Sequence, residues 1–483
     1  CRWYMFLAVS PAATATLRHS SLNGMYTTTG ITIGAIGQVQ GSINWTQRHP
    51  PTWSLLGVSR DALMIGMMQI GAILGAIIAG TIADKFGRKI SCAISGLCQA
   101  FGGLICLVDF FIPAASRGTG NTMLGYTLPF IMYFIGRFVA GVGVGMACHS
   151  VPMIVAELSP EHLRGPFDGA FQLFVCLGIT TSFVLNLIIL TLGEDVTNWW
   201  GSTGFLMPLG MPAISGMLMA LTVYFFCPES PKWLLTNTTE GGGGSAAARS
   251  ALGKCRWGSD ESTDAEYHRM VQAKRREEIE SEGEEVGWLD LFSVGYFKIV
   301  AIAFGICWLQ VFIGIDIMTT YNVPVFVNLG FTPKTANITT VVVGVVMLIA
   351  VIPSLFLVEV LGRKTLLIWG SIGHIVAIGG AGACALGVQL SCKGYPGDPS
   401  DVATYGIMDH WCEGNTTLPV LKWVGLVCCM GWVIAFALSW GPVAWVVPSE
   451  MLPAAVRSKA LTLCVLGNWV SDYIVVASFP ALM

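Results

Sequence analysis

The stretches "ADKFGRKI" (83–90) and "EVLGRKTL" (359–366) carry one short charged pattern twice in an otherwise apolar chain. Each stretch comes between two long apolar runs, so each is expected to form a tight turn between neighbouring segments. Gly87 and Gly362 occupy the same place in the two copies, and glycine enters such a turn without steric cost. The repetition indicates that the chain contains one structural unit twice.

A second pattern repeats in the same order. The stretch "AELSPEHLRG" (156–165) matches "SEMLPAAVRS" (449–458), and each copy again separates two apolar runs. Two patterns that recur in the same order are typical of a duplicated membrane transporter.

Charged residues are scarce throughout the chain. Of its 483 residues, 54% are hydrophobic and 11% are charged, whereas a soluble protein carries about 25% charged residues. Most of the surface is therefore expected to face lipid, as in a protein with many membrane spans. The net charge of -3 gives no indication of a nucleic-acid partner.

The sequence shows no pattern that is typical of an enzyme. We find no nucleophile paired with a base, no metal-binding cluster and no phosphate-binding loop. The glycines of "GVGVG" (141–145) lie inside an apolar run, where they indicate close helix packing rather than a nucleotide site. We therefore expect neither catalysis nor a cofactor.

Ten apolar stretches are long enough to cross the bilayer as helices. They lie at residues 61–83, 90–112, 127–152, 169–192, 204–227, 297–323, 338–359, 365–388, 420–447 and 460–482. An eleventh is placed near 22–42, and the even count of a duplicated chain implies a twelfth after Met483. The expected fold class is an all-α polytopic membrane protein.

One polar segment divides the spans into two groups. We expect residues 1–227 to form an N-terminal transmembrane bundle and residues 297–483 an incomplete C-terminal bundle. The segment 228–296 contains a glycine run (241–244) that is typical of a flexible linker. Its later part mixes charges with apolar residues at helical spacing, which predicts one or two short helices.

Lysines and arginines gather in the loops on one side of the predicted spans, which makes that side, and the N-terminus, cytosolic. Possible N-glycosylation patterns at Asn44, Asn337 and Asn415 fall in predicted loops on the opposite side. Cys392 and Cys412 bracket another such loop, so a disulfide between them is a hypothesis that depends on an extracellular setting. We expect the plasma membrane, with an organelle membrane as the alternative.

Five stretches carry a resemblance to known transporters. The stretch "GTIADKFGRKI" (80–90) resembles the loop motif G-x-x-x-D-x-x-G-R-[RK] of the major facilitator superfamily. Four others resemble its sugar-porter family, which includes glucose facilitators and proton–sugar symporters: "GRFVAGVGVG" (136–145), "VPMIVAELSPEHLRG" (151–165), "PESPKWLL" (228–235) and "GPVAWVVPSEMLPAAVRS" (441–458). The resemblance runs from about Gly30 to Met483. It implies two six-helix bundles, with a substrate site between them at mid-membrane that opens to each side in turn.

Charged residues at the cytosolic ends of the spans are candidates for a gate. We expect opposite charges to pair between the two bundles when the cytosolic side closes. The alternative is that the basic members only fix the orientation in the membrane, which leaves the repeated acids unexplained. The candidates are Asp84, Arg88, Glu157, Arg164, Glu229, Arg363, Glu450 and Arg457.

Polar and aromatic residues at mid-span are candidates for the substrate site, because a polar group facing lipid is costly. Amides and carboxylates hydrogen-bond sugar hydroxyls, and aromatic rings pack on the sugar's C–H faces. Any one of them alone is more often a helix-packing contact. The candidates are Gln172, Gln310, Asp316, Tyr321, Phe436, Trp445, Asn468 and Trp469. Of these, Gln172, Gln310, Trp445 and Asn468 match sugar-binding positions of the resembled family.

The chain departs from the family pattern at several polar positions. Val311 stands for a glutamine, Asp316 for an asparagine and Met347 for a polar residue. These replacements leave open a hexose other than glucose, a polyol or a less hydroxylated substrate. Gln310 and Asp316 would point about 120° apart on an unbroken helix, so we expect the helix to unwind near Gly314.

The resemblance also bears on energy coupling. In proton symporters of this family, an aspartate in the first span binds the proton and a fourth-span arginine is its partner. Arg137 matches that arginine, but Thr32 replaces the acid and cannot titrate. Facilitated diffusion is therefore expected. The alternative is proton-coupled transport with Asp316 as a relocated proton site.

Two further alternatives stay open. The organic-ion transporters carry similar loop motifs, and a sugar sensor would bind without transporting. The four matched positions favour a monosaccharide transporter that works as a monomer, with a small-molecule sugar and the lipid bilayer as its partners.

Overall fold

The computed structural model describes residues 54–55, 58–107, 123–159, 164–195, 206–237, 243–256, 260–280, 287–391 and 418–482. Apart from one two-residue antiparallel pair, β1 (Ser54–Leu55) with β2 (Val58–Ser59), the regular elements described are helices. Several predictions fall outside the described residues: the first span at 22–42, the sequons at Asn44 and Asn415, and the pair Cys392 and Cys412.

Five of the six spans predicted before residue 228 are present as helices, and the sixth, at 22–42, lies outside the described residues. The five helices are α4 (Arg60–Phe86), α5 (Arg88–Cys106), α7 (Met123–Leu158), α8 (Arg164–Asp195) and α10 (Leu206–Phe226). The boundary between α4 and α5 is Gly87, with φ 103°. A turn at this glycine sends the chain straight back into the membrane, as the first copy of the repeated pattern predicts.

The predicted spans after residue 296 are also helical, but two of them are broken. The helices are α14 (Phe297–Phe312), α15 (Ile315–Thr320), α16 (Asn322–Asn328), α17 (Pro333–Val360), α18 (Arg363–Ser391), α20 (Leu418–Leu438), α21 (Trp440–Met451) and α22 (Ala454–Leu482). Eight described helical segments are long and apolar enough to cross a membrane, and two shorter apolar ones are Gly210–Phe226 and Phe297–Phe312.

The two breaks have identifiable causes. Gly314 adopts a left-handed conformation with φ 81° and separates α14 from α15, which confirms the expected unwinding at this residue. The second break is at Ser439, three residues before Pro442. Proline lacks the amide hydrogen that would bond the carbonyl four residues earlier, so the helix ends at Leu438 and restarts.

Glycines allow α4 and α7 to pack with their backbones in contact. A side chain at Gly71 or Gly75 would collide with the backbone of α7, and one at Gly141 or Gly145 would collide with that of α4. These are small residues at four-residue spacing on both helices, which permit close approach in lipid. The glycines of "GVGVG" are therefore used for helix packing, as predicted.

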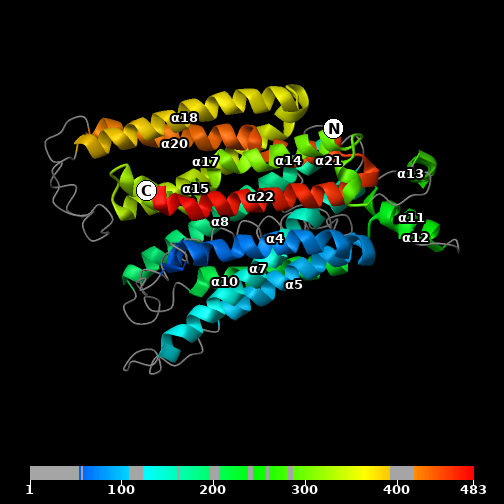
Figure 1. The fold of residues 1–483 in the computed structure, drawn as a ribbon, viewed down its shortest axis with the longest axis horizontal. Coiled ribbons are helices and arrows are strands. Elements are labelled where there is room, and N and C mark those ends of the chain that lie inside the picture. The colour runs from blue at the N-terminus through cyan, green and yellow to red at the C-terminus, as the bar shows by residue number, and fades with distance from the viewer. Residues whose placement is uncertain are drawn as a thin grey trace.

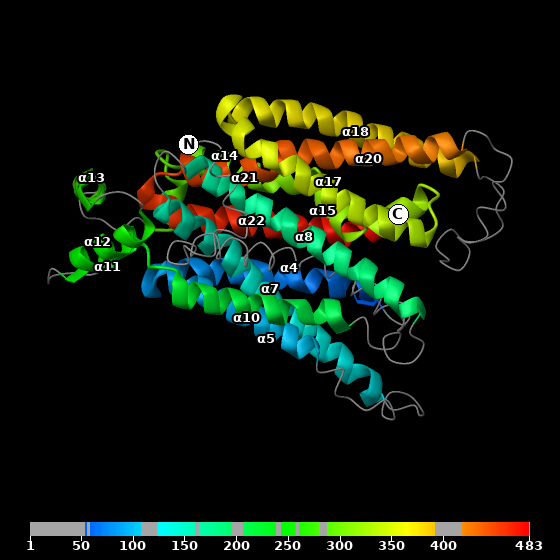
Figure 2. The same ribbon diagram turned by 180° about the vertical axis from the view of Figure 1, so that it is seen from behind.

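The helices form two groups that meet along two seams (Figure 1; Figure 2). Helices α4, α5, α7 and α10 pack together on one side, and α17, α18 and α20 on the other. The seams are formed by α4 against α22 and by α8 against α17. In the second seam, Thr180 donates a hydrogen bond to the carbonyl oxygen of Gly344 at 2.8 Å. The domain limits at 227/228 and 296/297 stay a prediction.

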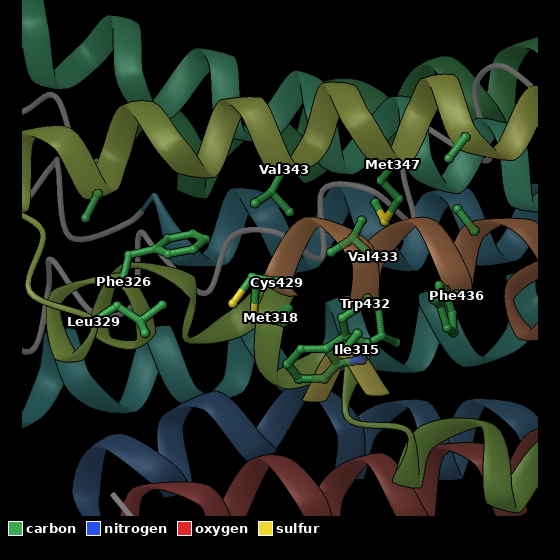
Figure 3. Packing of buried hydrophobic residues seen from close by; sticks show 14 of the residues in the cluster. Ile315, Met318, Phe326, Leu329, Val343, Met347, Cys429, Trp432, Val433 and Phe436 are labelled. Atoms are coloured by element: carbon green, nitrogen blue, oxygen red, sulfur yellow. The ribbon is translucent and has the colours of Figure 1, made fainter. Parts of the chain in front are cut away.

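An apolar cluster supports the broken helix α14/α15 from the side of α20. Figure 3 shows Trp432 of α20 beside Ile315, the first residue of α15. A side chain added at Gly314 would lie 3.2 Å from the Trp432 ring, so the turn is packed tightly. Met347, which replaces a polar residue of the family pattern, is buried in the same cluster.

Three α-helices follow α10 before the 3-10 helix η5 (Leu289–Phe292) and the next span: α11 (Pro231–Asn237), α12 (Gly243–Cys255) and α13 (Asp260–Glu280). They lie together at one end of the molecule (Figure 1; Figure 2). Helix α13 lies in the later part of the segment, where one or two short helices were predicted. Helix α12 begins at Gly243, inside the glycine run, because three alanines with high helix propensity follow that run. Arg256 holds this unit to the span end, donating to both carboxylate oxygens of Glu266 and to the carbonyl oxygen of Leu158 at 2.8 Å.

Candidate functional site

Two amide side chains meet at the break between α14 and α15. Asn468 of α22 donates to the side-chain oxygen of Gln310 at 3.1 Å and to the carbonyl oxygen of Cys307 at 3.1 Å. The Gln310 amide in turn donates to the carbonyl oxygens of Trp440 and Gly441, at 3.3 and 3.5 Å. Both side chains are buried. The two amides therefore join helices α14, α21 and α22.

Two further predicted residues surround Gly441. A side chain there would lie 3.1 Å from the Phe436 ring and 3.4 Å from the amide carbon of Gln172. Gln172 comes from α8, which belongs to the first half of the chain, and its amide contacts the sulfur of Cys176 at 3.7 Å. The absence of a side chain at Gly441 thus lets groups from both halves approach one point.

Trp445 extends the same region along α21. Its ring meets that of Phe171, next to Gln172, edge to face with centroids 5.3 Å apart. Phe171 lies on α8 and Trp445 on α21, so this contact also joins the two halves. The structure therefore brings together Gln172, Gln310, Phe436, Trp445 and Asn468.

Two other predicted substrate residues make mainly packing contacts, and one of them, Trp469, lies in the same apolar cluster as Phe171, against which Trp445 packs. The hydroxyl of Tyr321 donates to the carbonyl oxygen of Val476 at 3.0 Å, and its ring packs against Phe479 with centroids 5.1 Å apart. Trp469 is buried in an apolar cluster with α7 residues such as Val151. In this conformation both side chains support packing around α22.

Asp316 lies beside a second acid that the sequence reasoning missed. The carboxylates of Asp316 on α15 and Asp472 on α22 are close enough for their charges to repel, and the Gln69 side chain of α4 hydrogen-bonds Asp472. Asp472 is only 7% exposed, and Asp316 is half-buried. Asp472 and Gln69 stand in apolar spans, so the argument that singled out Asp316 would have found them too.

Arg137, the expected partner of a proton site, is held within the first group of helices. Its Nε donates to the Tyr133 hydroxyl at 3.0 Å, and its Nη1 lies 3.6 Å from the sulfur of Met68 on α4. The guanidinium also lies 5.5 Å from the Tyr133 ring centroid. This buried cation is thus surrounded by α7 and α4 side chains.

Where α4 ends and α5 begins, at the end of the first half predicted to be cytosolic, the repeated motif forms a partly buried charge cluster. Arg88 contacts Asp84 at 3.3 Å and Glu157 at 3.4 Å. The Glu229 carboxylate accepts hydrogen bonds from the backbone amides of Lys89 at 3.1 Å and Ser230 at 2.9 Å. Burial raises the pKa of Glu229, and these backbone bonds oppose the rise.

The corresponding cluster of the second half is simpler. Arg363 pairs with both oxygens of Glu450, at 3.1 and 2.7 Å. Arg457 donates to the carbonyl oxygen of Leu452 at 3.0 Å and so caps the end of α21. Arg164 begins α8, but its side chain lies outside the described part of the structure.

The ion pairs described at the predicted gate join residues of the same half, whereas a pairing between halves was expected. Among the contacts described at this end, Ser458 of α22 joins the two halves. Its hydroxyl donates to Asp84 at 2.9 Å, and its carbonyl oxygen lies 3.3 Å from Nε2 of His149. A neutral residue thus bridges the halves at this end.

Asn337 does not lie in a loop, as was predicted. Thr332 caps α17 by accepting a hydrogen bond from the backbone amide of Thr335, and Pro333 occupies the first turn. The helix therefore begins before the sequon, since proline is well suited to a first turn. Glycosylation of Asn337 stays a prediction. Among the described residues, no group of three or more His, Cys, Asp or Glu is arranged to hold a metal ion.

Comparison with known proteins identifies the family. The family model described as "Sugar (and other) transporter" matches residues 24–483. The D-xylose-proton symporter of Escherichia coli (strain K12) is 29% identical over 431 residues, which are 88% of this chain and 76% of that protein. The glucose transport protein of a Synechocystis strain is 28% identical over 452 residues, 92% and 84% of the two chains.

The fold agrees with that of a solved transporter. The structure of the major facilitator superfamily proton:xylose symporter XylE, bound to 6-bromo-6-deoxy-D-glucose, superposes with a TM-score of 0.74 at 24% identity. The match covers 97% of this chain and 89% of XylE, so the chain has the major facilitator fold. The chain therefore belongs to the sugar transporter family of this superfamily, and it is a multi-pass membrane transporter rather than an enzyme.

Proposed function

We propose that this transporter carries a monosaccharide of the hexose class by alternating access. The observation that supports it best is the amide pair of Gln310 and Asn468 at the break of α14/α15, with Gln172 of the other half across Gly441. Amides donate and accept at once, which suits hydroxyl groups that also do both. Relatives named as glucose transporters, such as GlcP of Staphylococcus epidermidis at 26% identity, agree with this substrate class.

The aromatic residues complete the proposed site. Phe436 and Trp445 present apolar surfaces next to the amides, and a sugar ring has C–H faces that such surfaces bind. Trp445 also contacts Phe171 across the two halves. A sugar that displaces the contact between Phe171 and Trp445, or packs against it, would change interactions in both halves at once. Alternating access requires that binding act on both halves in this way.

The breaks in the two interrupted helices are proposed to act as hinges. Helix ends at Gly314 and Ser439 can swing without breaking backbone hydrogen bonds in the middle of a helix, because those bonds are already interrupted there. Gln310 lies just before one break, and the carbonyl groups it contacts, those of Trp440 and Gly441, lie just after the other. Binding of a hydroxyl to Gln310 would therefore act on both hinges.

Two modes of energy coupling remain candidates within this function. Facilitated diffusion is expected because Thr32 replaces the first-span acid of the family's proton symporters. Proton-coupled symport is the second candidate, and the observation that favours it is the pair of neighbouring acids Asp316 and Asp472. In either mode the transporter is proposed to act as a monomer, in the plasma membrane.

The test is exchange of labelled sugar for unlabelled sugar in proteoliposomes, with a panel of hexoses and no ion gradient. At least one hexose is expected to exchange saturably. Because each loses hydrogen bonds or ring contact to the sugar, Gln310→Ala and Trp445→Ala are expected to slow exchange by about tenfold or more. Trp369→Ala is the matched control, since that tryptophan is 67% exposed on the outer face of α18.

The outcomes separate the alternatives. Absence of exchange with every hexose contradicts the proposal and favours a sensor or another substrate. Exchange that is equally fast in Trp445→Ala and Trp369→Ala would mean that the sugar binds elsewhere.

A further inference from the structure

Asp472 is a buried acid at a seam between the two halves. It faces Asp316 of α15 and the Gln69 amide of α4, so three helices contribute to one polar group of side chains. Asp472 is 7% exposed and Gln69 is 5% exposed. Neighbouring residues of α4 and α22 also pack closely there, since a side chain at Gly66 would lie 2.6 Å from the Tyr473 ring.

Two buried polar atoms of this group of side chains lack a hydrogen-bond partner among the described residues. They are Oδ1 of Asp472 and Oε1 of Gln69. Both atoms are acceptors, so neither can satisfy the other while Asp472 is ionised. A proton on Asp472 would turn one of its oxygens into a donor and supply what the group lacks.

The charges around Asp316 and Asp472 also favour a proton on one of the two carboxylates. Two carboxylates that repel each other in an apolar setting are strongly disfavoured as two charges. Besides Asp316, the group that faces Asp472 is the neutral amide of Gln69 on α4. The buried cation Arg137 of α7 contacts Met68, on the face of α4 that packs against α7. The described Glu450 of α21 lies at the far, cytosolic end.

We propose that Asp316 and Asp472 share one exchangeable proton, held against Gln69, and that this proton is carried with the sugar. The proposal rests on the proposed sugar transport and decides between its two modes of coupling. It places the proton site on α4, α15 and α22, in contrast to the first-span acid that Thr32 replaces.

The proton site and the sugar site are connected through α22. Asn468 and Asp472 are four residues apart on this helix, so their side chains lie on one face about one turn apart. Asn468 bonds Gln310 before the break at Gly314, and Asp472 faces Asp316 after it. A change in the angle at Gly314 therefore alters both contacts together.

The cycle follows from this geometry. With the outer side open, a proton from water forms an O–H bond with one carboxylate of the pair, reached through the half-buried Asp316. The pair then carries one negative charge, and α15 can remain packed against α22 while sugar binds to Gln310 and Asn468. When the cytosolic side opens, the O–H bond breaks and the proton passes to water there, so proton and sugar cross in the same direction.

The test compares two assays on the same proteoliposomes. The first is sugar exchange without a gradient, which reports sugar binding and alternating access. The second applies a proton gradient directed along uptake and measures sugar accumulation, together with proton entry by a trapped pH-sensitive dye. The wild type is expected to exchange, to accumulate sugar above its outside concentration, and to admit protons when sugar is added.

Asp472→Asn is expected to keep exchange within about threefold of the wild type, because an amide can hydrogen-bond Gln69 without a proton. Gradient-driven accumulation is expected to fall to the level without a gradient, and sugar-induced proton entry is expected to disappear. Glu261→Gln, which removes an exposed acid of α13, serves as the control and is expected to match the wild type in both assays. Asp316→Asn supplies a second variant: with the neighbouring charge removed, accumulation is expected to require a lower pH outside.

The failures are distinguishable. If the wild type does not exchange any hexose, the proposed transport function fails, and the coupling proposal fails with it. If the wild type exchanges but neither accumulates sugar nor admits protons, only the coupling proposal is overturned. Proton-driven accumulation that persists in Asp472→Asn, or accumulation driven by sodium without protons, overturns it as well.

Discussion

The two copies of the repeated loop motif have similar sequences but differ in how deeply their charged side chains are buried. In the first half, the side chain of Arg88 is 12% exposed and that of its partner Glu157 is 10% exposed. In the second half, the corresponding Arg363 is 35% exposed and Glu450 is 30% exposed. Duplication therefore preserved the turn and the charges, while the surroundings made one pair part of the interior and left the other near the surface.

The difference comes from what covers each motif. Helix α11 follows the first half, and Trp233 on it donates to the carbonyl oxygen of Asp84 at 2.9 Å. Ser458 of the second half covers Asp84 from the other side. Glu359, which stands in the second copy where Asp84 stands in the first, is exposed. Among the contacts described, Trp233 and Ser458 enclose the first motif, and the contact with Ser458 joins it to the opposite half.

The largest contrast is expected from removing each arginine's charge. Arg88→Gln leaves Glu157 buried without its cation and is expected to cost about 3 kcal/mol of stability, as for other buried pairs that lose one partner. Arg363→Gln is expected to cost about 1 kcal/mol or less, because water solvates the exposed Glu450. Thermal unfolding of the purified variants in detergent measures both. If both variants lowered the midpoint of thermal unfolding equally, the burial of the first pair would not make it more important for stability than the second.

A smaller contrast is expected from the turn glycines. Both adopt positive φ, 103° at Gly87 and 82° at Gly362, so alanine strains either turn. A side chain at Gly87 would also collide with the Glu229 carboxylate, whereas one at Gly362 meets nothing within 4 Å. Gly87→Ala is therefore expected to cost about 2–3 kcal/mol and Gly362→Ala about 1–2 kcal/mol. Gly87→Ala combined with Glu229→Ala should recover part of the loss, and no recovery would mean that backbone strain explains all of it.

The fold could be predicted from the sequence because lipid imposes a simple rule. Ten spans were located by apolar length alone, since every backbone polar group in lipid must be satisfied within a helix. The breaks were also predictable, because Gly314 and Pro442 are residues that interrupt helices. The short helices α11 and α12 were not, because such helices depend on contacts like that of Arg256 with Leu158, which composition does not reveal.

The candidate site was predictable in part for a related reason. Polar side chains in apolar spans mark Gln172, Gln310 and Asn468, and the structure brings these three near one another. The same signal marked Tyr321, whose hydroxyl is engaged with Val476 on the neighbouring helix. A sequence pattern shows that a polar group needs a partner but does not show which partner it finds. Asp472 was missed although it carries the same signal, and its partners are known only from the packing of α4, α15 and α22.

The smallest effect, and the most informative one about the gate, is expected at Ser458. Ser458→Ala removes the hydroxyl that donates to Asp84 and keeps the backbone carbonyl that faces His149. One hydrogen bond to a charged group contributes about 1.5 kcal/mol, which would favour opening of the cytosolic side by about tenfold. Hydrogen exchange is expected to speed up at the cytosolic ends of α4 and α7. Ser478→Ala is the matched control, because Ser478 bonds only Val475 of its own helix among the contacts described. If both variants exchange alike, the two halves are held closed at this end by apolar contacts such as Phe171 with Trp445, and the polar bridge of the first motif contributes little.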